Sequence, residues 1–179
     1  LTHEKTYIEY MIKMRYITKQ AMLVWSFGFS TSRTSRHNSL KGEYTPTLRA
    51  HEDELKEIAL GMADAGVGFM EIVSDWNEPD PETEFEVLKK IAKASGRPLV
   101  FTCTQRHDRP NFWKDLMKMS LEAQEEGLSI RPVVPPRPIG LLFGLDGRHT
   151  PFSVTITYNS IALLPCLLST SPSPRAGLL

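Results

Sequence analysis

Amphipathic segments at helical spacing alternate with short apolar segments along the first 134 residues. Apolar positions three and four residues apart predict helices over residues 4–23, 51–65, 82–95 and 110–126. Short apolar or aromatic runs predict strands over residues 23–30, 69–73, 99–104 and 130–134. Gly66, Gly96 and Gly127 follow three of these helices, where glycine is the preferred terminating residue.

This alternation predicts parallel strands that are joined by crossover helices. We interpret the chain as α/β, a partial (β/α) TIM-type barrel of about four β/α units with an irregular C-terminal tail. Its 179 residues are fewer than the ~250 that a closed eight-stranded barrel usually needs. An open doubly wound sheet has the same alternation, but no glycine-rich nucleotide-binding motif follows a predicted strand.

The composition changes abruptly near the C-terminus. Residues 1–158 form the predicted partial barrel domain, and residues 159–179 form an apolar and then Ser/Pro-rich tail. Between residues 161 and 179 the only charged residue is Arg175, and residues 169–174 contain only Ser, Thr and Pro. Such a segment is typical of disorder. We therefore interpret the tail as disordered, or as non-native sequence after a shifted frame or read-through.

Charge and cysteine content narrow the functional classes. The 21 basic and 21 acidic residues balance, so no electrostatic argument favours nucleic acid or an anionic membrane. The sequence has no run of ~18 apolar residues that would span a membrane. The two cysteines, Cys103 and Cys166, predict neither a disulfide scaffold nor a zinc finger. A reducing cytoplasm is the expected location.

Polar side chains gather where the predicted strands end. In a barrel these ends face one site, and loops held by a scaffold often carry function. An arginine such as Arg33 or Arg131 would clamp a substrate carboxylate in a two-pronged geometry, and Asp75 would accept a proton or bind a cation. The alternative is that these groups cap helices and satisfy backbone at the strand ends. The predicted substrate-binding residues are Ser30, Thr31, Arg33, Asp75, Gln105 and Arg131.

The sequence assigns no catalytic residue and no metal ligand. His37, His51, His107 and His149 are histidines without the pair spacing of a metal motif, and we expect them to be exposed to solvent. Cys103 lies inside an apolar run, where a free thiol behaves as a small hydrophobic residue.

Several short motifs resemble one enzyme family. These motifs are G-F-S-T-S-R-T-x-x-H at 28–37, E-x-V-S-D-W at 71–76, S-G-R-P-L-V-F-T at 95–102 and E-G-L-S-I-R-P-x-V-x-P-R-P-I-G at 126–140. In these motifs, and over about residues 7–158, the chain is similar to the D-aminoacylase or N-acyl-D-amino-acid deacylase branch of the amidohydrolases. The resemblance implies a hydrolase of carbon–nitrogen bonds in linear amides, with an N-acylated amino acid as the small-molecule substrate.

The resemblance also implies zinc or another divalent metal, which activates a water molecule. Zinc-binding members carry a histidine at the ends of two middle strands. At the matching places this chain has Val73-Ser74-Asp75 and Thr102-Cys103-Thr104, without a histidine. We find no ligands for the metal in this chain, although Cys103 stands where one histidine would be. We therefore expect the chain alone to be inactive, and its open sheet edges to favour self-association. The alternative is a non-catalytic, degenerate amidohydrolase homologue that binds a carboxylated ligand or a protein partner through Arg33 and Arg131.

Overall fold

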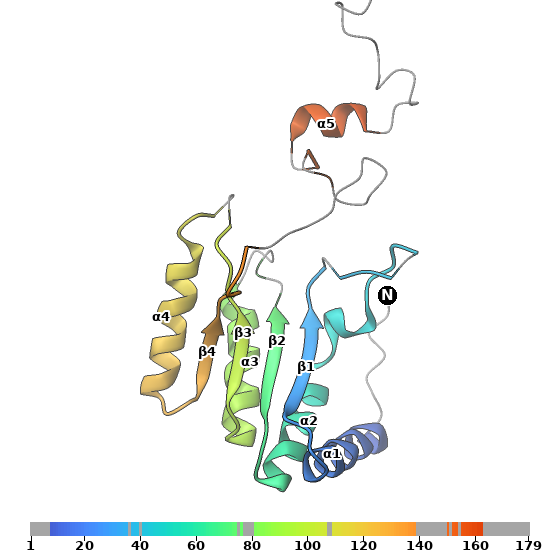
Figure 1. Ribbon diagram of the computed structural model, residues 1–179, viewed down its shortest axis with the longest axis vertical. Helices are drawn as coiled ribbons and strands as arrows, with labels where there is room; N and C mark the ends of the chain where they lie inside the picture. The colour runs from blue at the N-terminus through green and yellow to red at the C-terminus, as the bar shows by residue number, and fades with distance from the viewer. Residues whose placement is uncertain are drawn as a thin grey trace, which may run out of the picture. The chain divides into compact units, whose positions relative to one another are not determined.

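The structure is a computed structural model with two compact units, residues 1–137 and 138–179 (Figure 1). It describes residues 8–35, 37–39, 41–74, 76, 81–106, 109–138, 150, 152–153 and 155–162. Among these residues, no helix is both long and apolar enough to cross a membrane.

The first unit alternates helices and strands. Its elements are α1 (Ile8–Leu23), β1 (Gly28–Arg33), the 3₁₀ helix η1 (Pro46–Arg49), α2 (Glu52–Ala65), β2 (Phe69–Ser74), α3 (Pro81–Ser95), β3 (Leu99–Thr102), α4 (Phe112–Glu125) and β4 (Ile130–Val133). The second unit contains the short helix α5 (Ile156–Ile161), whose N-cap Thr155 accepts a hydrogen bond from the backbone N–H of Tyr158.

The four strands form one parallel sheet in the order β1-β2-β3-β4, which confirms the predicted α/β class. The helices of this unit lie on one face of the sheet, and the arrowheads in Figure 1 mark the carboxyl edge of all the strands. Side chains alternate between the faces along each strand. Met70, Ile72, Leu99 and Phe101 point to the helices and are at most 1% exposed. This is the helix-covered face, and it holds the core.

The opposite face, here called the open face, carries the alternate residues of each strand. Their register follows from the strand pairing. Phe69 and Val133 on this face are 42% and 46% exposed. The open face consists of Gly28, Ser30 and Ser32 of β1, Phe69, Glu71 and Val73 of β2, Val100 and Thr102 of β3, and Arg131 and Val133 of β4.

Strand β1 begins five residues later than predicted. Helix α1 extends to Leu23, and a turn follows in which the N–H groups of Val24 and Ser26 both donate to the Ala21 carbonyl. Trp25 in this turn has a φ of 91°. The strand starts at Gly28 because β1 approaches β2 closely there, where a Cβ would lie 2.1 Å from the Phe69 carbonyl oxygen. The run of hydroxyl residues is therefore the strand itself and not its exit loop.

The helix boundaries follow local signals more closely. His51 caps α2 by accepting from the Asp53 N–H, and Gly66 ends it in the left-handed conformation. Helix α1 packs on α2 where Gly61 leaves room, since a Cβ there would lie 2.5 Å from the Arg15 carbonyl oxygen. The Arg15 guanidinium makes two 2.8 Å hydrogen bonds to the Asp64 carboxylate across the same contact.

Candidate functional site at the carboxyl edge of the sheet

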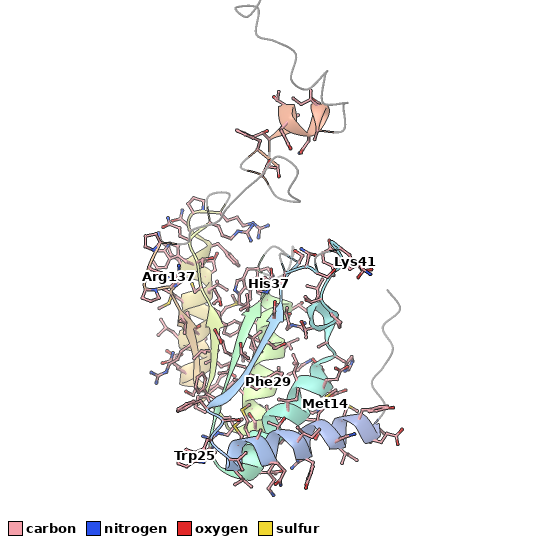
Figure 2. All side chains as sticks on the ribbon, turned by 45° about the vertical axis from the view of Figure 1, so that its right-hand side comes forward. Met14, Trp25, Phe29, His37, Lys41 and Arg137 are labelled. Atoms are coloured by element: carbon pink, nitrogen blue, oxygen red, sulfur yellow. The ribbon has the colours of Figure 1, made fainter. Side chains whose placement is uncertain are left out.

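At the end of β1 a serine and a histidine meet. The Ser32 Oγ and His37 Nδ1 atoms lie 2.5 Å apart, and the His37 backbone N–H donates to the Thr34 carbonyl to close the turn. Figure 2 places His37 at this end of the sheet and Trp25 at the other end. A serine nucleophile needs a base that is oriented by a third group. No acidic side chain contacts the His37 ring within the described part of the chain, so the contact orders the turn.

The ends of β2 and β3 are joined by Trp76. Its ring is buried in edge-to-face contact with Phe101, at a centroid distance of 5.3 Å. The indole Nε1 donates to the Thr102 carbonyl at 3.0 Å, and the Arg106 guanidinium donates to the Trp76 carbonyl at 2.7 Å. These contacts hold Arg106 at the carboxyl edge. The sequence analysis missed Arg106, although it directly follows Gln105 in the same exit segment.

Arg33 lies on the helix-covered side of the strand end. Its guanidinium donates to both carboxylate oxygens of Glu84, at 2.8 and 3.0 Å, and to the Ala50 carbonyl at 2.6 Å. The two charged side chains are only 13% and 14% exposed. Arg33 therefore ties β1 to α3 and to the segment before α2. Thr31, two residues earlier on the same face, is also buried.

Ser30 and Arg131 share one row in the middle of the open face. The register places Ser30 beside Glu71, Glu71 beside Val100, and Val100 beside Arg131. The Ser30 hydroxyl donates to the Glu71 carboxylate at 2.9 Å. Arg131 is exposed and is the second residue of β4, so it lies below the strand end. The described residues provide no ion-pair partner for it.

The six predicted substrate-binding residues therefore do not form one group. Ser30 and Arg131 are in the middle row of the open face, whereas Thr31 and Arg33 lie on the helix-covered side. Gln105 is exposed just beyond β3. Asp75 lies outside the described residues, so its assignment stays a prediction.

Ser74 and Cys103, at the strand ends where the resembled family has metal-binding histidines, are not suited to bind a metal ion. Cys103 is 4% exposed in the core, and burial raises the pKa of its thiol, which disfavours the thiolate that binds metals. The Ser74 hydroxyl is buried without a hydrogen-bond partner among the described residues. Those residues also contain no group of three His, Cys, Asp or Glu side chains close enough to share a metal. The donor chemistry at these two strand ends therefore does not match a zinc site.

A shallow hollow of about 370 Å³ lies between the starts of α3 and α4. Arg109 stacks on the Phe112 ring at 5.9 Å, and Asp115 brings a negative charge to the same hollow. The other lining residues are Pro81, Pro110 and Asn111. Because Arg109 and Asp115 carry opposite charges, the hollow favours neither an anionic nor a cationic ligand.

Comparison with protein-family models, with curated proteins and with solved structures found no match for this chain. The family suggested by the motifs therefore depends on those motifs alone. The structure contributes a parallel sheet with one open face and a set of polar groups at its carboxyl edge.

Proposed function

We propose that the first unit is one wall of an amidohydrolase-type (β/α) barrel that acts on carbon–nitrogen bonds of N-acylated amino acids. The observation that carries this proposal is a parallel sheet with helices on a single face. Open parallel sheets are normally covered by helices on both faces. In a barrel, by contrast, the helices surround the outside and the inner face meets other strands.

The carboxyl edge supplies the groups that such a substrate requires. Barrel enzymes bind substrates at the carboxyl ends of their strands. An N-acylated amino acid has one carboxylate and one amide, and a guanidinium matches the carboxylate with two parallel hydrogen bonds. We assign this role to Arg106, which lies at this edge and already donates to the Trp76 carbonyl, so the carboxylate would compete for or share its guanidinium. We assign hydrogen bonds to the amide to Gln105 and to the Ser32 hydroxyl. We assign these residues to binding and orientation, since Ser74 and Cys103 do not fit the metal.

The test is a titration of the isotope-labelled chain with N-acetyl-D-methionine, followed by amide chemical shifts. We expect perturbations at the ends of β1 and β3, because the ligand binds at the carboxyl edge. Arg106→Met should weaken binding by roughly tenfold or more, as for a lost charged hydrogen bond. The matched control is Arg97→Met, because Arg97 also donates to backbone carbonyls, those of Gly66 and Gly68, at the opposite edge of the sheet.

A second control compares the ligand with an analogue of nearly the same shape that lacks the carboxylate charge. The amide of N-acetyl-D-methionine lacks the carboxylate and should bind at least about tenfold more weakly. Equal binding of the two ligands would contradict the role of Arg106. An equal loss in the Arg97 variant, or shifts confined to the other edge, would contradict the proposed site.

A non-catalytic binding module is the second candidate. It is favoured by Ser74 and Cys103, which stand where the resemblance requires metal ligands. Because this chain lacks the metal ligands, zinc titration by calorimetry distinguishes the two candidates only on a version of the protein extended to a complete barrel. A stoichiometric, tight zinc site supports the hydrolase, whereas ligand binding without zinc binding supports the module.

A further inference from the structure

The hollow between the starts of α3 and α4 carries two opposite charges beside an aromatic ring. The Arg109 guanidinium lies over the Phe112 ring, and Asp115 follows Phe112 by three residues on α4. Side chains three residues apart share one side of a helix, so the guanidinium and the carboxylate border the same hollow. Within the described part of the chain, neither group forms an ion pair with the other or with a third residue.

The ring below Arg109 is held in place by the carboxyl edge of the sheet. Phe112 is only 7% exposed and makes an edge-to-face contact with Trp76, at a centroid distance of 6.4 Å. An arginine over an aromatic face interacts through its charge and its plane, which leaves its N–H groups for a ligand. Asn111 makes no side-chain capping hydrogen bond at the start of α4, so its amide is a further donor in the hollow.

We propose that this hollow binds a free amino acid in its zwitterionic form. A ligand with one charge gains an attraction and meets a repulsion here, whereas a zwitterion matches both charges. Its carboxylate accepts from Arg109 and Asn111, and its ammonium group donates to Asp115. The volume of about 370 Å³ is near the lower limit of small-molecule sites, roughly 300–1,000 Å³, and suits one amino acid whose side chain contacts Pro81 and Pro110.

The structural role of Asp115 does not account for the whole arrangement. A carboxylate in the first turn of a helix interacts favourably with the helix dipole. That interaction explains an acidic residue at this position, but it does not explain the unpaired guanidinium of Arg109 in the same hollow. The inference does not rest on the proposed hydrolase function. An N-acylated amino acid has no ammonium group, so the hollow and Arg106 prefer different ligands.

The test is a titration of the isotope-labelled full chain at neutral pH, followed by amide chemical shifts. The three ligands are D-methionine, D-methioninamide and N-acetyl-D-methionine, which carry both charges, only the positive charge and only the negative charge. We expect D-methionine to shift the amides of Phe112 and Asp115 with a dissociation constant on the order of 1 mM, as for a small ligand in a shallow site. The other two ligands should bind there at least about tenfold more weakly, since each leaves one charge of the hollow without a partner.

Variants of the two charged residues test the same contacts from the side of the protein. Arg109→Met and Asp115→Asn should each weaken D-methionine binding at least about tenfold. Lys114→Met is the matched control for Arg109, because the Lys114 Nζ atom lies over the Trp113 ring at 5.7 Å but does not line the hollow. Glu122→Gln, at an exposed acid of the same helix, is the control for Asp115. Asp115→Glu keeps the charge and should retain binding, which separates loss of charge from loss of helix.

Three results would each overturn the proposal. These are equal binding of all three ligands at the start of α4, an equal loss in the control variants, and no shifts there at about 20 mM D-methionine. The readout lies on α4 and uses the free amino acid, whereas the proposed function is read at the ends of β1 and β3 with the N-acylated ligand. The failure of one proposal is therefore distinguishable from the failure of the other.

Discussion

The two faces of the sheet differ in how far their side chains are buried and in whether those side chains are charged. On the helix-covered face, Ile72 and Phe101 are fully buried by α2, α3 and α4. On the open face, Phe69 and Val133 keep more than two fifths of their surface exposed, beside the charged Glu71 and Arg131. The first face has the composition of a finished core. The second combines exposed apolar side chains with two opposite charges that lie two strands apart and do not pair with each other.

The difference shows how a parallel sheet uses its two surfaces. Burying a Phe or Val side chain contributes roughly 1.5–3 kcal/mol, and the exposed Phe69 and Val133 do not receive that stabilisation from the described residues of the first unit. Stability of the unit thus comes mainly from the helix-covered face.

The largest expected effect is the difference in stability loss between two phenylalanine-to-alanine substitutions, one on each face of the sheet. Phe101→Ala removes a fully buried ring from the helix-covered face and should cost about 3–5 kcal/mol in the free energy of unfolding. Phe69→Ala on the open face should cost under about 1 kcal/mol in the monomer. Urea unfolding at low protein concentration measures both values. Similar costs for the two substitutions would contradict the division between the faces.

The next effect concerns the close approach of β1 to β2. Gly28→Ala places a Cβ 2.1 Å from the Phe69 carbonyl oxygen, so the strands must move apart. We expect a loss of about 1–3 kcal/mol, as for other overpacked sites. Amide exchange should show the loss of protection first in β1. Ser30→Ala, two residues along the strand, is the control and should keep the protection of β1 unchanged. Unaltered exchange in the Gly28 variant would show that the approach is looser than described.

A smaller effect separates Arg33 from a role in substrate binding. Arg33→Met leaves the Glu84 carboxylate without its partly buried partner and should cost about 2 kcal/mol. Arg33→Met/Glu84→Leu should recover part of that stability, because neither charge is then left alone. Thermal unfolding measures the stabilities, and titration with N-acetyl-D-methionine measures binding. A stable Arg33→Met variant that no longer binds the ligand would instead support the carboxylate clamp predicted from the sequence.

The smallest effect is a pH dependence that arises from Cys103 in the helix-covered face. Burial raises the pKa of this thiol, so the folded state keeps the proton at a pH where the unfolded state has lost it. The sign is therefore a loss of stability as pH rises above the ordinary thiol pKa of about 8.5, with a limit of about 1.4 kcal/mol per pH unit. Urea unfolding between neutral and alkaline pH measures this slope, and Cys103→Ala should reduce it. Equal slopes would place the thiol in contact with solvent.

The sequence predicts the order of elements well where local signals decide it. Gly66 and Gly127 marked helix ends correctly, because the left-handed turn that follows a helix favours glycine whatever lies nearby. The start of β1 was missed because the apolar residues before Gly28 resemble a strand more closely than the hydroxyl residues after it. Contact with β2 decides that boundary, and such a contact is not visible in one segment.

The candidate site was harder to predict for the same reason. A shift of strand position changes the face to which each side chain points. Ser30 and Arg33 belong to the same motif, yet one contacts Glu71 on the open face and the other contacts Glu84 on α3. The place of Arg106 depends on the Trp76 carbonyl, thirty residues away in sequence, which no local pattern reveals.

The most direct test of the difference between the two faces is the rate of thiol labelling at Val100→Cys, in the middle row of the open face, compared with the rate at the native Cys103 on the helix-covered face. The background chain carries Cys166→Ser and keeps the buried Cys103, and Leu121→Cys on the exposed surface of α4 is the reference. If the two faces differ as described, the thiol at position 100 is labelled at a rate that approaches the rate at position 121, and Cys103 is labelled much more slowly. A thiol at position 100 that is labelled as slowly as Cys103 would contradict the account.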